Sequence, residues 1–244
     1  MAVLSDLHLT AEASTRFRGA DTHASLRRIL ETLAAAPPDL LLLTGDLSHD
    51  GSEASYRALV SLLAPLARPW YVLAGNHDDP ARLERVVGAE RLLDDLVVGR
   101  WRIRGLTSAV PGRLEGRLTE RDRRRLAEDL AHSDQDWIVA LHHHPVATGS
   151  AWIDGSLLEE ADGFLELCTA SGRVRAVLYG HIHDAREERR GALALYATPS
   201  TCLAFPHPSS GLGTLRAPTP TGWRRLRLHP DGRHETEARW LPPA

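Results

Sequence analysis

The chain has 244 residues, yet it contains no lysine and only two cysteines. Arginine therefore replaces lysine throughout, which we interpret as a compositional bias and not as part of a mechanism. Cys168 and Cys202 lie far apart in the sequence. Such a pair indicates reduced, buried thiols in a cytoplasmic protein and not a disulfide framework.

Long apolar runs and a targeting signal are also missing. No run approaches the ~18–20 apolar residues that a membrane-spanning helix needs, and no secretory signal is visible at the start of the chain. The formal net charge of −3 gives no electrostatic footprint for nucleic acid. We therefore expect a cytoplasmic protein with no membrane or nucleic-acid partner. The first strand begins almost at Met1, which leaves the completeness of the N-terminus open.

Helical and strand patterns alternate along the chain. Residues His23 to Ala35 have the apolar spacing of an amphipathic helix, which Pro37-Pro38 would end. Four more helices are expected to begin at Ser52, Pro80, Thr119 and Ser156, the last of them ending at Ala170. Strands are expected at 2–4, 40–43, 71–73, 138–141 and 177–179, and the segments 97–107, 192–198, 223–228 and 236–240 are also strand-rich. Two packed sheets with helices outside each would account for both the alternating helices and strands and the strand-rich later part of the chain.

Short polar clusters begin where the apolar runs stop. Five of them offer only carboxylate, amide and imidazole groups: Asp6-Leu7-His8, Gly45-Asp46, Gly75-Asn76-His77-Asp78, His142-His143-His144-Pro145 and Gly180-His181-Ile182-His183. A sixth, Thr198-Pro199-Ser200, closes the series. Because the carboxyl ends of strands in an open α/β sheet converge on one crevice, these clusters are expected to meet at one site. The pattern is typical of a two-metal enzyme.

The spacing within the clusters supports this interpretation. In Asp6-Leu7-His8 the two ligand side chains would lie on the same side of an extended segment. The pair in His181-Ile182-His183 repeats that spacing. A single motif of this kind is weak, because polar turn residues often hydrogen-bond their own backbone. All five clusters in this order, each at a strand end, form a strong signal.

The order of the clusters resembles that of the calcineurin-like metallophosphoesterases over nearly the whole chain. The resemblance implies a binuclear centre in which a metal-bridging hydroxide attacks a phosphodiester. By this likeness one ion would be held by Asp6, His8, Asp46 and His183, and the second by Asp46, Asn76, His142 and His181. Ligands of mixed nitrogen and oxygen type without thiolate allow Fe, Mn, Zn or Co. The resemblance favours Fe and Mn.

The resemblance also implies a fold. We expect an α/β protein with a four-layer αββα sandwich of two mixed β-sheets flanked by helices. Residues 1–244 would form a single calcineurin-like domain, with 199–244 as a C-terminal loop and hairpin extension on the substrate side. Relatives suggest a homodimer.

His77 resembles the histidine of this family that is not a ligand, and it would protonate the leaving alkoxide. Asn76 and His77 would also contact the substrate. Some relatives have an acidic residue three positions after the bridging aspartate, where this chain has His49. We therefore assign no carboxylate partner to His77. A second departure is Leu106-Thr107-Ser108, where many relatives have Leu-Asp-Ser, and we expect little effect on metal binding.

Three consecutive histidines follow the strand at 138–141. The pattern Leu-His-His-x-Pro aligns His142 with the ligand of the family. By strand alternation His143 would point away from the site and be packed. His144 would then face the pocket and contact the substrate, or it would be packed in the interior like His143.

Segments outside the clusters narrow the substrate. They resemble the bacterial class III 3′,5′-cyclic-nucleotide phosphodiesterases at 19–22, 149–154, 198–202, Phe205, Gly222-Trp223-Arg224 and 231–232. The resemblance implies hydrolysis of 3′,5′-cyclic AMP to 5′-AMP, although these segments could also be a hairpin and loop framework shared by many relatives. Alternatives are a broad-specificity phosphodiesterase for glycerophosphodiesters or aryl phosphodiesters, and a scaffold of this fold without activity. Trp152 would stack on the nucleobase or pack in the core or a lid.

Overall fold

The computed structural model describes residues 1–205 and 219–243. The first sheet has five strands in the order β11(His234–Leu241), β10(Thr221–Leu228), β1(Ala2–Leu4), β2(Leu41–Thr44) and β3(Trp70–Leu73). Strands β1, β2 and β3 are parallel, whereas β10 is antiparallel to both of its neighbours. The sheet is therefore mixed.

The second sheet has six strands in the order β4(Asp95–Val98), β5(Trp101–Gly105), β6(Asp136–Ala140), β7(Val174–Tyr179), β9(Leu193–Ala197) and β8(Glu187–Arg190). Its four central strands are parallel, and the two edge strands are antiparallel to their neighbours. The strand-rich segment at 97–107 thus includes the end of β4 and the whole of β5, which are joined by a turn at Gly99. Strand β8 was not predicted, because its sequence Glu-Glu-Arg-Arg has no apolar alternation.

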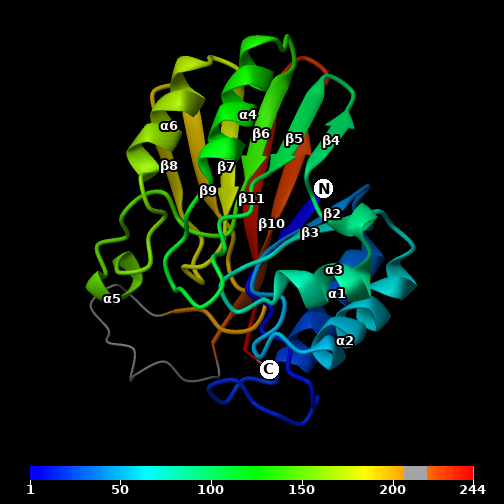
Figure 1. Cartoon of the computed structure of the whole chain (residues 1–244). Helices are drawn as coiled ribbons and strands as arrows, with labels where there is room; N and C mark the ends of the chain where they lie inside the picture. Colours follow the sequence, from blue (N-terminus) through cyan, green and yellow to red (C-terminus); the bar gives the residue numbers. More distant parts are fainter. Residues whose placement is uncertain (206–218, 244) are drawn as a thin grey trace.

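Helices cover the outer face of each sheet (Figure 1). The first sheet packs against α1(Thr22–Ala35), α2(Glu53–Leu63) and α3(Pro80–Val87), and the second against α4(Glu120–Ala131) and α6(Ala161–Ala170). The alternation along β2 shows the layering, since Leu41 and Leu43 face the helices while Leu42 faces the other sheet. The predicted αββα sandwich of two mixed sheets is confirmed.

Four of the predicted helices begin where the sequence indicated. The side chains of Asp21, Ser52, Asp79 and Thr119 each accept a hydrogen bond from a backbone N–H in the first turn. Two 3₁₀ turns, η1(Ala64–Leu66) and η2(Ala89–Arg91), follow α2 and α3.

The fifth predicted helix is wrong in its first part. The segment from Ser156 to Glu160 is a loop between a single turn, α5(Ala151–Asp154), and α6. Leu158 forms a β-bridge with Gly116, and Glu160 has a φ of 54°. A residue in the left-handed region interrupts a helix, so α6 starts only at Ala161.

One arginine joins the two sheets. Arg224 of β10 is fully buried and donates from Nε and Nη2 to the Ala197 carbonyl of β9, at 3.0 and 2.9 Å. It also pairs with Glu187 at 2.7 Å and lies over the ring of Tyr196. The segment Gly222-Trp223-Arg224 thus has a structural role here, which favours the framework interpretation of that part of the substrate pattern.

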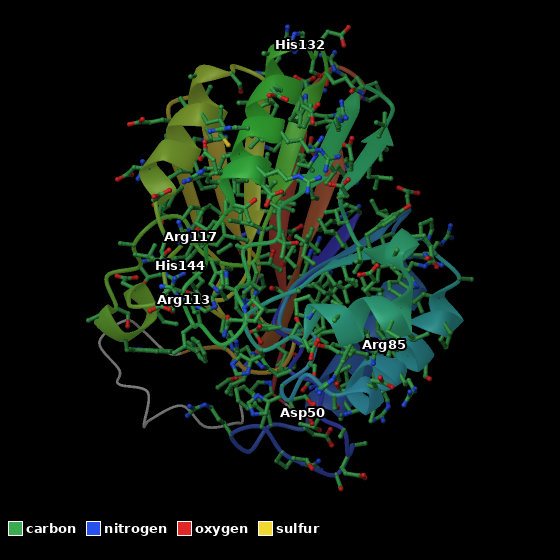
Figure 2. The ribbon with its side chains drawn as sticks, in the orientation of Figure 1. Asp50, Arg85, Arg113, Arg117, His132 and His144 are labelled. Atoms are coloured by element: carbon green, nitrogen blue, oxygen red, sulfur yellow. The ribbon has the colours of Figure 1, made fainter. Side chains whose placement is uncertain are left out.

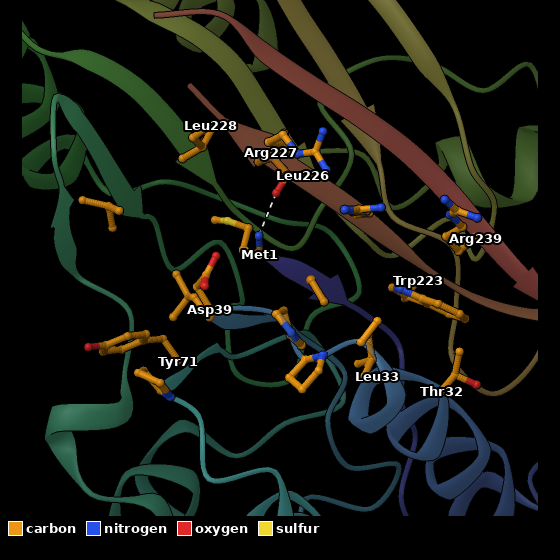
Figure 3. A pocket seen from close by; sticks show the side chains of 18 of the residues that line it. Met1, Thr32, Leu33, Asp39, Tyr71, Trp223, Leu226, Arg227, Leu228 and Arg239 are labelled. Atoms are coloured by element: carbon orange, nitrogen blue, oxygen red, sulfur yellow. Dashed lines mark hydrogen bonds between the residues drawn. The ribbon is translucent and has the colours of Figure 1, made fainter. Parts of the chain in front are cut away.

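A cavity of about 870 Å³ lies at the amino ends of β1, β2 and β3. Figure 3 shows the ammonium group of Met1 beside it, donating to the Leu226 carbonyl at 2.8 Å. The polar clusters lie at the opposite, carboxyl ends of these strands, so this cavity is separate from them. Within 1–205 and 219–243, the helices are too short or too polar to cross a bilayer.

Candidate metal centre

The five polar clusters meet at the carboxyl ends of the strands. Each comes from the loop that follows one of β1, β2, β3, β6 and β7. Figure 2 shows His144 and Asp50 below the strands, whereas His132, which follows α4, lies at the far end of the molecule. Except for the half-buried Asn76, the predicted ligands are buried. Segments more than 170 residues apart along the chain, such as those of His8 and His183, are therefore in contact.

The first group of candidate ligands is Asp6, His8 and His183, whose ligand atoms lie within 4.8 Å of one another. The Nε2 atoms of His8 and His183 are 3.0 Å apart. Asp6 Oδ1 lies 3.3 Å from His183 Nε2. Two imidazoles and one carboxylate thus present their ligand atoms to a common point.

The second group is Asp46, His142 and His181, again within 4.8 Å. His142 Nε2 lies 3.2 Å from His181 Nδ1 and 3.2 Å from the side-chain oxygen of Asn76. The predicted division of ligands between two ions therefore matches two separate groups in space.

Asp46 lies between the two groups. Its Oδ2 is 3.5 Å from His8 Nε2, and its Oδ1 is 3.4 Å from His142 Nε2. One carboxylate therefore offers one oxygen to each group, which is the arrangement that a residue bridging two ions requires.

The hydrogen bonds on the far sides of the rings test whether this centre fits cations. His142 Nδ1 donates to the Thr44 carbonyl at 2.8 Å, so in the neutral ring Nε2 carries a bare lone pair. His181 Nε2 lies 2.7 Å from Ser156 Oγ, whose own proton goes to the Ile153 carbonyl, so His181 Nδ1 is bare as well. Two lone pairs facing each other at 3.2 Å repel unless a positive charge lies at them.

The first group shows the same arrangement. His183 Nδ1 donates to the Leu203 carbonyl at 2.7 Å and leaves Nε2 bare toward His8. Such far-side hydrogen bonds are the usual way in which a protein orients histidine ligands. The donor sets fit two cations.

The electrostatics of the centre agree with this fit. Burial opposes a charge on His142, but the Asp46 and Asp6 carboxylates and the Thr44 carbonyl together outweigh it and raise the pKa of His142 to about 9. Burial lowers the pKa values of His8 and His181 well below the usual value, so these rings are neutral and able to coordinate. The centre stabilises positive charge beside Asp46 and otherwise presents neutral imidazoles.

The local geometry of the ligand loops differs from the prediction. Among the described residues, five of the eight non-glycine residues with positive φ are predicted ligands: Asp6, His8, Asp46, His181 and His183. The Asp-x-His and His-x-His segments are therefore not extended, and the expectation that strand alternation aligns their side chains is wrong. The left-handed backbone turns each side chain toward the centre, at about 1–2 kcal/mol of strain per residue.

Glycines precede the ligands because the loops are packed too closely for a side chain. A Cβ atom on Gly75 would collide with Asp46 Oδ1, and one on Gly180 would collide with Ser5 Oγ. The glycines that precede Asn76 and His181 are thus needed for the ligand loops to pack this closely.

His77 lies at the edge of the first group, with its ring 4.8 Å from that of His8. Its Nδ1 lies 3.2 Å from the backbone carbonyl of His49, and its backbone N–H donates to Asp46 at 2.9 Å. The sequence offered no carboxylate partner for His77, and in the structure the His49 carbonyl orients its ring instead. His49 itself stacks on His77 at 5.1 Å and also belongs to a third possible ligand triplet with His8 and His77.

Asp78 has a role that sequence reasoning missed. Its carboxylate accepts hydrogen bonds from the backbone N–H groups of Leu47, Ser48 and Gly75 and from the Tyr56 hydroxyl, at 2.8–3.1 Å. Burial and the nearby Asp46 raise the pKa of Asp78 to about 6. Asp78 thereby ties the Asp46 loop to the Asn76 loop. Its place in the cluster Gly75-Asn76-His77-Asp78 was the one sequence feature that could have indicated this role.

The other two members of the triple histidine are fully buried. His143 is packed, as alternation predicted, with Nδ1 2.8 Å from Ser108 Oγ and Nε2 donating to the Leu114 carbonyl. His144 stacks on His181 at 5.3 Å and lies 3.6 Å from Asp154. This placement behind His181 favours a supporting role for His144 over the predicted contact with substrate.

Trp152 lies in α5, half-buried, and its ring meets Phe205 edge-on at 5.0 Å. Phe205 in turn stacks on the predicted ligand His183 at 3.9 Å. The two aromatic side chains therefore form a wall beside the first group.

Comparisons with known proteins agree with this geometry. The family model described as calcineurin-like phosphoesterase matches residues 1–185. The chain is 43% identical over 238 residues to the 3′,5′-cyclic adenosine monophosphate phosphodiesterase CpdA of Pseudomonas aeruginosa, covering 96% of this chain and 86% of the relative. It is 33% identical to the protein of the same name from Escherichia coli, covering 98% and 88%.

Solved structures with the same fold have little sequence similarity. A dimetal phosphatase from Danio rerio has a TM-score of 0.68 and 13% identity, covering 100% of this chain and 98% of that one. The purple acid phosphatase PPD1 of yellow lupin has a TM-score of 0.65 and 15% identity, covering 92% and 48%. These structures support the fold alone. With a matching family model and close relatives over nearly its full length, the chain belongs to the calcineurin-like phosphoesterase family.

Proposed function

We propose that this protein is a binuclear-metal phosphodiesterase that hydrolyses 3′,5′-cyclic AMP to 5′-AMP. The observation that carries the proposal is the position of Asp46, which offers one oxygen to each of two ligand groups. The extensive identity to relatives named as cyclic AMP phosphodiesterases supports the choice of substrate.

The proposed ligands are those of the two groups in space. Asp6, His8, Asp46 and His183 would hold one ion, and Asp46, Asn76, His142 and His181 the other. When bound, the ions would supply a nucleophile from water at neutral pH and would neutralise charge on the phosphate. With two carboxylates among these ligands, two divalent ions would keep an excess positive charge, which would suit an anionic diester.

His77 is the proposed proton donor. Hydrolysis forms a bond from phosphorus to the water oxygen and breaks the bond from phosphorus to O3′, which then needs a proton. The His77 ring lies beside the first group, and the His49 carbonyl holds its Nδ1. Its Nε2 is then the atom that would give the proton to O3′. Asn76 and Trp152 are proposed to contact the substrate.

Several features stay predictions. We propose Fe and Mn as the metals, a homodimer as the assembly, the cytoplasm as the compartment and one domain over 1–244. Part of the proposed substrate-side extension at 199–244 falls on 206–218, outside the described residues.

A substrate panel tests the proposal. Metal-reconstituted protein is assayed with cyclic AMP, cyclic GMP, 2′,3′-cyclic AMP, a glycerophosphodiester and an aryl phosphodiester. We expect the highest kcat/KM for cyclic AMP. Equal kcat/KM across the diesters would instead identify a broad-specificity phosphodiesterase, and a protein that binds no metal and has no activity would identify a scaffold.

A further inference from the structure

Ser156 touches the metal centre from outside the predicted ligand set. Its side-chain oxygen lies 2.7 Å from Nε2 of His181, and both residues are buried, with exposed fractions of 8% and 9%. The hydroxyl proton of Ser156 is donated to the Ile153 carbonyl at 2.8 Å. The serine oxygen can therefore only accept from His181, which fixes the proton of that ring on Nε2 and leaves Nδ1 bare toward His142.

The other far-side hydrogen bonds of the centre have a different origin. His142 and His183 donate to the backbone carbonyls of Thr44 and Leu203. Carbonyls of this kind persist whatever side chain the residue carries. Among the described ligand histidines whose far-side nitrogen is hydrogen-bonded, His181 is thus the one whose orientation depends on a side chain.

The loop that carries Ser156 is held firmly on both sides. Gly116 exchanges backbone hydrogen bonds with Leu157 and Glu159, at 3.3 and 2.7 Å. The N–H of Leu158 donates to the His144 carbonyl at 3.1 Å. Arg113 also pairs with Glu159. The position of the serine is therefore set by the backbone contacts of its own loop.

We propose that Ser156 is a positioning residue for the second ion, the one assigned to Asp46, Asn76, His142 and His181. This inference rests on the proposed binuclear centre. Ser156 sets the tautomer and the direction of the His181 ring, while stacking on His144 holds its plane. Loss of such a partner typically weakens metal affinity by about 10–100-fold, so one ion of the pair is affected.

The experiment is a titration of metal-free protein with Mn²⁺, followed by calorimetry and by metal analysis after dialysis against graded chelator. The wild type is expected to bind two ions per chain. In Ser156→Ala the affinity for one ion falls about 10–100-fold while the other is retained. Electron paramagnetic resonance at intermediate loading then shows isolated Mn²⁺ in place of a coupled pair. Ser156→Thr, which keeps the hydroxyl, restores most of the affinity.

Ser108→Ala is the matched control. It removes an equally short, buried serine–histidine hydrogen bond, of 2.8 Å, from His143, which is not a proposed ligand. We expect both ions to bind Ser108→Ala as they bind the wild type. Thermal unfolding of the metal-free variants shows whether either serine acts through folding alone.

The outcomes separate the inference from the function on which it rests. Unchanged affinity for both ions in Ser156→Ala, or the same loss in Ser108→Ala, overturns the positioning role and leaves the binuclear enzyme standing. A wild type that binds fewer than two ions overturns the proposed function and the inference together.

Discussion

The two sheets make different contributions to the metal centre. Loops of the first sheet supply the proposed oxygen ligands, Asp6, Asp46 and Asn76, and loops of the second supply three of the four imidazoles, His142, His181 and His183. The difference is also one of stabilisation. The Asp6 and Asp46 carboxylates accept backbone N–H groups of the ligand loops, whereas the second-sheet imidazoles are oriented by far-side acceptors.

The first sheet therefore supplies the negative charge of the centre, and the second supplies imidazoles whose orientation is fixed by hydrogen bonds. Removing the Asp46 carboxylate would change the net charge at both proposed ions, because Asp46 faces both groups. Removing support from an imidazole of the second sheet would affect only the ion proposed for this ring. The centre therefore depends on contact between the sheets, and the largest losses are expected where one residue serves both groups.

The largest expected effect comes from Asp46→Asn, which removes the shared charge while preserving shape. Because electrostatic stabilisation by bound ions is worth several kcal/mol, kcat/KM for cyclic AMP should fall by about 10³-fold or more. Metal analysis should show fewer than two ions per chain. Asp50→Asn makes the same change at a more exposed carboxylate close by in the sequence and should retain both ions. Two tightly bound ions in Asp46→Asn would contradict the claim that this first-sheet carboxylate serves both ligand groups.

His77→Asn separates proton transfer from metal binding on the first-sheet side. We expect kcat for cyclic AMP to fall by about 10²–10⁴-fold, because the leaving O3′ loses its proton donor. Metal content should stay at the wild-type value. An aryl diester whose leaving group is already a weak base should lose much less activity. Equal losses on the two substrates would remove His77 from the role of proton donor.

Arg224→Leu tests the contact between the sheets themselves. The Ala197 carbonyl would be left buried without its donor, which should lower the free energy of unfolding by about 1–3 kcal/mol. Arg233→Leu breaks an exposed pair with Asp231 and should change it by less than about 1 kcal/mol. Urea denaturation of the metal-free proteins measures both values. Similar changes in the two variants would show that Arg224 does not secure the sheets.

The sequence allowed the layers and the membership of the centre to be predicted, because both depend on simple patterns. Apolar strands followed by hard ligands place Asp46 or His142 at a strand end whatever the details of the loop. The confirmed helix starts at Ser52 and Thr119 follow from side-chain capping, which is equally local.

Features that depend on long-range packing could not be predicted. The left-handed backbone of Asp6 is imposed by neighbouring loops and contradicts the expectation from strand alternation. Ser156 has the pattern of a helix start until the bridge between Gly116 and Leu158 interrupts it. Arg224 resembled a substrate signal because its buried partner lies on another sheet. In each case the deciding atom is remote in the sequence.

The smallest expected effect concerns Trp152, on the second-sheet side of the centre. Its ring meets Phe205 edge-on and would offer a face to the nucleobase, and such stacking contributes about 1–3 kcal/mol per base. Trp152→Ala should therefore raise KM for cyclic AMP by about 5–150-fold, with little change for an aryl diester that has no base. Trp152→Phe should keep most of the affinity. If Trp152→Ala weakened both substrates equally, the ring would act by supporting Phe205 and His183, and the second sheet would contribute orientation alone.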